Sequence, residues 1–351
     1  MAFFRQRTAG ALALSAAALL TLSACAGGDP AGSSESSGSA SPSGQSSESQ
    51  GEQGTPAATV TDMAGDEVTL PENPESIIAT DNRSFRTLDA WGVELAAAPR
   101  ALMNGEEVSY ETNDDVYDLG SHREPDMEGF VTTEPDLIIN GQRFSSMKEE
   151  IKGLAPEAAL VDSNLDTEAE GFRIDEALKQ HTTLLGDVFG HQDDAKKLIE
   201  DFDASIERAK GAYNDEDTVM GLIASGGNLA YAAPSTGRAI GPVFDVLGLT
   251  PSLEEDGSTN HMGDDISVEA IAQSNPDWII VMDRDAATDV SEEADYSTAE
   301  ELIKESPALQ NVTAVKEDQI IYLPNNFYIT EDIQNYTTLM NDIADAFESN
   351  A

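Results

Sequence analysis

Two stretches of this chain share one pattern, Glu134-Pro-Asp-Leu-Ile-Ile-Asn-Gly-Gln-Arg143 and Asn275-Pro-Asp-Trp-Ile-Ile-Val-Met-Asp-Arg284. In both, a Pro-Asp turn leads into a short apolar run, and an arginine follows the aspartate by seven residues. A glutamate stands seven residues before each proline, at Glu128 and Glu269. The matched offsets predict two similar lobes, each with a helix that starts near the glutamate, a buried strand, and an arginine beyond the strand's carboxyl end. In open α/β sheets, ligands bind at that end.

Short apolar runs recur along the chain and are typical of buried parallel strands. They are Ile77–Ala79, Leu137–Ile139, Val219–Ile223, Trp278–Met282 and Gln319–Leu323. Amphipathic stretches such as residues 84–91, 242–247 and 268–273 lie between them. This alternation predicts an α/β fold with two Rossmann-like lobes.

The segment 167–190 contains no proline, and its apolar residues recur roughly at helical spacing. We predict one long helix here, joining an N-terminal α/β lobe over residues 57–166 to a C-terminal α/β lobe over residues 191–351. Gly171 and Gly186 weaken the helical pattern. A single helix would restrict the relative motion of the lobes more than a pair of loops would.

The first 24 residues have the features of an export signal. Arg5 and Arg7 precede an apolar stretch over residues 11–24, which is shorter than the roughly 20 residues that a membrane span needs. Small residues stand just before Cys25, as in a bacterial lipobox, whose cysteine carries the lipid. Residues 25–56 are rich in Ser, Gly, Glu and Gln and predict a disordered tether behind the lipidated cysteine.

Composition excludes several classes of function. The chain has 351 residues, with 66 Asp and Glu against 19 Lys and Arg, which gives a formal charge of -47. Such a surface repels the phosphate backbone, so nucleic acid is not a partner. The single cysteine excludes an internal disulfide and a cysteine-based zinc or iron–sulfur site.

The combined motifs resemble the substrate-binding lipoproteins of iron-siderophore ABC importers, and most closely the branch for ferric catecholate or mixed-type siderophores. The resemblance covers nearly all of residues 57–351. It rests on the lipobox, the Ser-rich tether and the motifs at 120–128, 134–143, 245–248 and 275–284.

This resemblance implies two α/β lobes bridged by a helix, a ligand cleft between them and little closure on binding. It also implies a monomer without catalytic activity or a permanent cofactor, lipid-anchored on the outer face of the cytoplasmic membrane. Its partners would be the ferric siderophore that it carries, and the permease and ATPase of the importer.

The resemblance places five ligand-binding residues in the cleft: Arg143, Arg238, Arg284, His261 and Tyr328. The arginines would face an anionic catecholate complex, because guanidinium groups are always charged and stack on aromatic rings. His261 and Tyr328 would complete the iron shell of a siderophore with too few donors. The sequence alone leaves simpler roles open, namely surface salt bridges for the arginines, a solvated His261 and a packed Tyr328.

Glu128 and Glu269 match the acidic residues that dock on the permease in the resembled family, one in each lobe. Glu124 competes for this role in the first lobe. A local explanation is also open, because a carboxylate near a helix start is stabilised by the helix dipole.

Other ligands and another class of function remain open at this stage. Haem, cobalamin and hydroxamate siderophores are bound by the same scaffold in the family at large. A lipid-anchored exported hydrolase is the alternative from another class. The chain lacks a Gly-x-Ser-x-Gly elbow, a His-Glu-x-x-His helix and a glycine-rich phosphate loop, and it has only four histidines. Paired carboxylates, however, arise by accident among 66 acidic residues.

Overall fold

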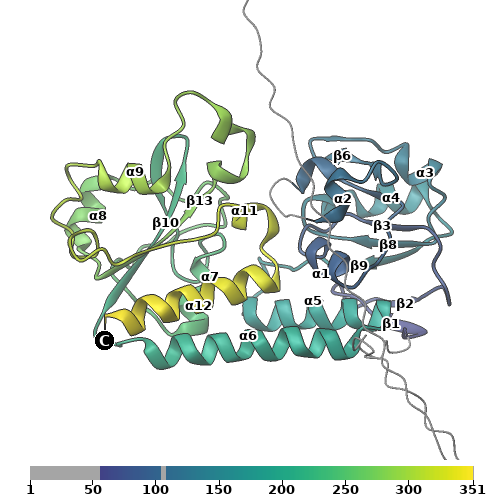
Figure 1. Ribbon diagram of the computed structural model, residues 1–351, viewed down its shortest axis with the longest axis horizontal. Coiled ribbons are helices and arrows are strands. Elements are labelled where there is room, and N and C mark those ends of the chain that lie inside the picture. Colours follow the sequence, from purple (N-terminus) through teal and green to yellow (C-terminus); the bar gives the residue numbers. More distant parts are fainter. Residues whose placement is uncertain (1–55, 104–107, 351) are drawn as a thin grey trace, which may run out of the picture. The chain divides into compact units, whose positions relative to one another are not determined.

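The computed structural model describes residues 56–103 and 108–350. The export signal, Cys25 and nearly all of the expected tether lie outside these residues. Within the described part, no helix is both long enough and apolar enough to cross a membrane. Two five-stranded sheets dominate it, one in each half of the chain (Figure 1).

The N-terminal sheet is entirely parallel, and its strands lie in the order β5-β4-β3-β8-β9. The strands are β3 (Ile77–Ala79), β4 (Ala97–Ala98), β5 (Tyr117–Asp118), β8 (Leu137–Asn140) and β9 (Ala159–Asp162). The strands that follow β3 along the chain, β4 and β5, are added on one side of it, whereas β8 and then β9 are added on the other side. The order therefore reverses between these two neighbours, and a crevice forms at their carboxyl ends.

The C-terminal sheet also has five strands but is not entirely parallel. Its path is β11-β10-β13-β14, and β12 pairs with the other end of β10. All pairs are parallel except β10 with β11. The strands are β10 (Thr218–Ser225), β11 (Asn228–Tyr231), β12 (Thr250–Pro251), β13 (Trp278–Asp283) and β14 (Ile320–Tyr322). The order reverses between β10 and β13.

Neighbouring residues of a central strand pack into hydrophobic clusters on opposite faces of the sheet. The strand therefore needs apolar side chains at every position, which explains the continuous apolar runs. In β8, Leu137 and Ile139 belong to one hydrophobic cluster and Ile138 to another. In β13, Ile280 belongs to one hydrophobic cluster and Ile279 to another. Because side chains alternate across a strand, both faces of each sheet are covered. The predicted α/β fold is confirmed.

Helices flank the two sheets, and small hairpins complete the fold (Figure 1). The N-terminal half contains α1 (Phe85–Ala90), α2 (Ser109–Thr112), α3 (Gly129–Thr132) and α4 (Lys148–Leu154), with hairpins β1 (Thr59–Thr61)–β2 (Glu67–Thr69) and β6 (Gly120–Ser121)–β7 (Glu124–Pro125). The C-terminal half contains α6 (Gln192–Ala212), α7 (Gly241–Leu247), α8 (Val268–Ser274), α9 (Ala299–Lys304), α10 (Thr313–Lys316), α11 (Phe327–Thr330) and α12 (Ile333–Ser349).

The connecting helix is shorter than the sequence predicts. Helix α5 spans Ile174–Phe189, whereas the expected helix began at residue 167. Gly171 has a φ of +74°, a left-handed conformation that interrupts a helix, and the helix starts only after it. Inside α5, a Cβ at Gly186 would lie 2.7 Å from the Cβ of Ala195, so this glycine lets α5 pack closely on α6. Helix α12 lies alongside α6 (Figure 1).

The repeated Pro-Asp turns have a structural role. Asp136 Oδ2 accepts a hydrogen bond from the backbone N–H of Glu75, just before β3, at 2.8 Å. Asp277 Oδ2 accepts from the backbone N–H of Thr218, where β10 begins, at 2.8 Å. In each half the aspartate ties the start of one central strand to its neighbour. Part of the internal repeat therefore serves the sheets rather than a ligand.

A seam of polar contacts joins the segment around α1 to the start of α12. Arg86 Nε lies 3.5 Å from Asp332 Oδ2, and Arg86 Nη1 donates to Asn335 Oδ1 at 3.1 Å. Gln334 Nε2 donates to Thr87 Oγ1 at 2.9 Å. These contacts and α5 together connect the two lobes at the base of the cleft.

Candidate functional site

Three arginines surround the ring of Tyr328. The guanidinium carbons of Arg143, Arg238 and Arg284 lie 5.0, 5.1 and 4.9 Å from the ring centroid. Each distance is within the range of a cation–π contact. Tyr328 comes from the single turn of α11 and is buried. The structure thus brings together four of the five residues that the sequence assigned to the cleft.

Arg143 belongs to the short 3-10 helix η2 (Gln142–Met147), which directly follows β8. Its Nη2 donates to the backbone carbonyl of Tyr328 at 3.1 Å, while its Nε is buried without an acceptor. Burial, together with the charge of Arg238, lowers the pKa of Arg143. Among the described residues, no carboxylate forms a direct ion pair with Arg143, although the charge of Glu331 acts on it from farther away.

Arg284 follows β13, the strand equivalent to β8. Its Nη1 donates to Asp285 Oδ1 at 2.7 Å, and its Nε is buried without an acceptor. Asp285 is itself held by the backbone N–H of Gly226, at 2.5 Å. This aspartate fixes Arg284 and offsets part of its charge.

Arg238 lies in the loop before α7, and its Nε donates to Glu331 Oε1 at 2.6 Å. A Cβ at Gly237 would lie only 2.4 Å from the carbonyl carbon of Ala232, so only glycine allows this close loop path. Burial alone would lower the pKa of Arg238, but the charge and hydrogen bond of Glu331 outweigh it and raise the pKa. Arg238 therefore stays charged and lines the polar side of the cleft.

Glu331 bridges the two lobes and was not found from the sequence. Its Oε2 accepts from Arg83 Nη2 at 2.8 Å, while its Oε1 accepts from Arg238. Glu331 is 3% exposed and Arg83 is 6% exposed. Burial would raise the pKa of this carboxyl, but the charges of Arg238 and Arg83 hold the pKa below its usual value. Glu331 is therefore a buried carboxylate shared by two arginines.

Asp81 holds the loop that carries Arg83. It accepts from the backbone N–H of Arg83 at 3.0 Å and from Ser163 Oγ at 2.7 Å, and its Oδ2 lies 3.2 Å from His181 Nε2 on α5. Burial opposes ionisation of Asp81, but the hydrogen bond and charge of His181 and the charge of Arg83 lower its pKa. Ser163 and His181 both contact the aspartate, so this cluster lacks the serine–histidine hydrogen bond of a hydrolase triad.

The charge around Tyr328 also acts on its hydroxyl. Burial raises the pKa of a phenol, but the charges of Arg143, Arg238 and Arg284 outweigh this effect and lower the pKa of Tyr328. The phenolate form is therefore stabilised at this position. Phenolate is the form of tyrosine that would ligate ferric iron.

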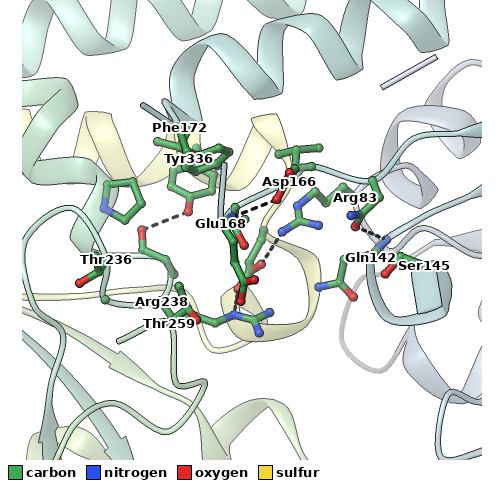
Figure 2. A pocket seen from close by; sticks show the side chains of 18 of the residues that line it. Arg83, Gln142, Ser145, Asp166, Glu168, Phe172, Thr236, Arg238, Thr259 and Tyr336 are labelled. Atoms are coloured by element: carbon green, nitrogen blue, oxygen red, sulfur yellow. Dashed lines mark hydrogen bonds and ion pairs between the residues drawn. The ribbon is translucent and has the colours of Figure 1, made fainter. Parts of the chain in front are cut away.

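Two pockets meet at this cluster, and Arg143 lines both. We call the first the polar pocket; its volume is about 440 Å³, and residues from both lobes line it (Figure 2). We call the second the cationic pocket; its volume is about 410 Å³. The second contains Tyr328, Arg284, Arg123 and His122. The two pockets therefore share Arg143 and differ in the rest of their lining.

His261 does not join the cluster. It is exposed and lines neither pocket, although its near neighbour Thr259 lines the polar one. Partial burial and the charges of Arg284 and Arg238 lower the pKa of His261, which favours a neutral ring. In the described part of the chain, no group of three histidine, cysteine or acidic side chains is arranged to hold a metal ion.

Glu128 and Glu269 occupy matched places at helix starts. Glu128 is the N-cap residue of α3, and Glu269 lies in the first turn of α8. Both side chains are exposed, as is Glu124 in β7. The geometry leaves all three accessible to a partner.

The comparison with known families decides the class of the protein. A profile described as periplasmic binding protein matches residues 77–327. The chain belongs to this family. Members of the family bind solutes, so this binding protein is not an enzyme, and the exported hydrolase is no longer an alternative.

Curated relatives of this binding protein match most of its length. It is 29% identical over 283 residues to the ferric-anguibactin-binding protein FatB of Vibrio anguillarum, a match that covers 80% of this chain and 84% of FatB. It is 28% identical over 284 residues to the petrobactin-binding protein YclQ of Bacillus subtilis, again covering 80% of this chain and 84% of the relative.

Solved structures share the fold of this binding protein. The crystal structure of YclQ aligns with a TM-score of 0.69 at 26% identity, over 83% of this chain and 98% of that one. The catecholate-siderophore-binding protein VctP of Vibrio cholerae aligns with a TM-score of 0.68 at 23% identity, over 83% and 99%. The second likeness concerns the fold alone. Together they confirm two α/β lobes with a cleft between them.

Arg83, Arg123 and His122 also line the site, and the sequence carries a signal for each of them. Arg83 follows β3 closely, as Arg143 follows β8, and these are the two strands where the order reverses. Arg123 and His122 stand inside the quoted motif at 120–128 and line the cationic pocket. Glu331 had no such signal, because its partner Arg83 lies 248 residues away.

Proposed function

We propose that this chain binds a ferric siderophore of the catecholate or mixed type in the cleft and delivers it to an ABC permease for iron import. The observation that carries this proposal is the set of three guanidinium groups around Tyr328. One of them, Arg143, forms no direct ion pair with a carboxylate in the described part of the chain. The names of the relatives FatB and YclQ, which refer to ferric anguibactin and petrobactin, support the same class of ligand.

The charge of the site favours catecholate over hydroxamate. A ferric tris-catecholate carries three negative charges, whereas a ferric tris-hydroxamate is neutral. Arginine side chains in a partly desolvated cleft are costly to leave unpaired, and an anionic ligand would relieve that cost.

A titration with matched variants tests the proposal. The full chain is titrated with ferric tris(2,3-dihydroxybenzoate), and binding is followed by quenching of tryptophan fluorescence. Arg143→Ala should weaken binding at least about tenfold, a loss of about 1.4 kcal/mol. Arg208→Ala is the control, because Arg208 pairs with Asp345 and Glu348 on α12 and lines neither pocket. A change below about twofold in Arg143→Ala would contradict the assignment.

Iron ligation is the finer part of the proposal. Tyr328 is the candidate ligand, because its phenolate is stabilised and its ring lines the cationic pocket. His261 would have to move toward the cluster to reach the same iron. For a ferric complex with two open coordination positions, Tyr328→Phe should change the visible charge-transfer band and His261→Ala should change it less.

The remaining assignments concern the cell surface. We propose that Cys25 carries the lipid, that residues 25–56 form the tether, and that the protein acts as a monomer on the outer face of the cytoplasmic membrane. The proposed lobes cover residues 57–166 and 191–351, with 167–190 between them. Glu128 and Glu269 are the proposed docking residues for the permease, one in each lobe.

A further inference from the structure

The two pockets of the cleft differ in charge. Three arginines and one carboxylate, Glu293, line the cationic pocket. Three arginines also line the polar pocket, but they are matched there by three carboxylates, Asp166, Glu168 and Glu331. An anionic group entering the cleft is therefore attracted more strongly to one pocket than to the other.

Two of the carboxylates in the polar pocket are available to a ligand. Glu331 is already committed to Arg83 and Arg238. Asp166 and Glu168 are exposed, and neither forms an ion pair with any described residue. The backbone N–H of Glu168 donates a hydrogen bond to Asp166 Oδ1 at 3.2 Å. Figure 2 shows Glu168 near the middle of this pocket, between Arg238 and Gln142.

The polar pocket also offers neutral hydrogen-bonding groups from both lobes. Gln142 Oε1 is buried there with no donor among the described residues. Since a buried amide oxygen without a donor is costly, it indicates a missing N–H or O–H group. Hydroxyl and amide side chains complete this lining: Ser145, Asn164, Thr236 and Thr259.

We infer that the cleft is built for an asymmetric siderophore, with an anionic iron-binding head in the cationic pocket and a polar arm that carries an ammonium group in the polar pocket. The head contacts Arg143, Arg284 and Tyr328. The arm donates N–H groups to Asp166, Glu168 and Gln142. A threefold-symmetric tris-catecholate can still place its anionic oxygens against the arginines, but it offers no ammonium group to the free carboxylates.

This inference rests on the proposed function and specifies its ligand. Two ferric complexes with the same bis(2,3-dihydroxybenzoyl) head test it. In one complex the linker carries a protonated secondary amine, and in the other a methylene group takes its place. The wild-type chain should bind the amine complex at least about fivefold more tightly, which corresponds to about 1 kcal/mol.

Matched variants separate the pocket from the net charge of the protein. In Asp166→Asn with Glu168→Gln, the preference for the amine complex should fall below about twofold. Glu293→Gln, which removes a carboxylate from the cationic pocket, should keep the preference. A double variant that keeps the full preference would overturn the inference.

Equal binding of both complexes by the wild-type chain would also overturn the inference, while leaving the proposed function standing. Failure of both complexes to bind would contradict the proposed function as well.

Discussion

Nε of Arg238 lies 2.6 Å from Oε1 of Glu331, so a ligand-facing arginine is held by a buried carboxylate. The other oxygen of Glu331 binds Arg83 of the N-terminal lobe. Replacing this carboxylate by an amide leaves the buried guanidinium of Arg83 and the partly buried guanidinium of Arg238 without their counter-charge. We expect Glu331→Gln to lower the free energy of unfolding by about 1.5–3 kcal/mol, as measured by urea denaturation.

The same residue should contribute to acid sensitivity. The pKa of Glu331 is lowered in the folded state, so its stabilising effect is present above the unfolded pKa of about 4.5 and is lost as the pH falls through the folded pKa. The wild-type chain should therefore lose more stability than Glu331→Gln when the pH is lowered below about 4.5. Identical acid titration curves for the two proteins would show that Glu331 is not ionised in the cleft.

Tyr328 should ionise at a lower pH than Tyr322. Its pKa is lowered by three arginines, whereas burial raises the pKa of Tyr322 to about 12. Ultraviolet titration of the phenolate band should show an early step that is missing in Tyr328→Phe and kept in Tyr322→Phe. In Arg143→Ala this step should move to higher pH. An early step that survives in Tyr328→Phe would refute the assignment.

The exposed glutamates at the helix starts should matter for transport and not for binding. In Glu128→Ala with Glu269→Ala, ferric siderophore uptake by cells should be abolished, while the dissociation constant stays within about twofold. Glu150→Ala with Glu216→Ala is the control, because both of these side chains are also exposed. Normal uptake by the first pair, at matched protein levels, would remove both residues from the docking surface.

Gly141 should be essential for the loop between β8 and Arg143. A Cβ there would lie 2.5 Å from Asp81 Oδ2 and 2.7 Å from Ser163 Oγ, two groups that already share a hydrogen bond. Gly141→Ala should destabilise the protein by about 1–3 kcal/mol and weaken ligand binding, because both Arg83 and Arg143 are positioned by this region.

Gly153→Ala provides the contrast for that prediction. Gly153 lies inside α4, where a Cβ would meet nothing within 4 Å. Because alanine is the better helix former, Gly153→Ala should stabilise the protein by up to about 1 kcal/mol. Equal effects of the two substitutions in thermal unfolding would contradict the crowding proposed at Gly141.

The sequence by itself determined the strands and the place of two arginines. Apolar runs such as Leu137–Ile139 and Trp278–Met282 are local signals, because a strand buried on both faces needs apolar side chains at every position. An arginine that closely follows such a strand must emerge at its carboxyl end. Arg143 and Arg284 could therefore be placed from spacing alone.

The tertiary structure decided which of these side chains meet. Arg143 and Tyr328 are 185 residues apart, and Arg83 and Glu331 are 248 apart, so no local pattern connects them. The same holds for the exposed position of His261, outside both pockets. Ion pairs and cation–π contacts depend on distance in space, and only the packing of the two lobes around the base of the cleft sets those distances.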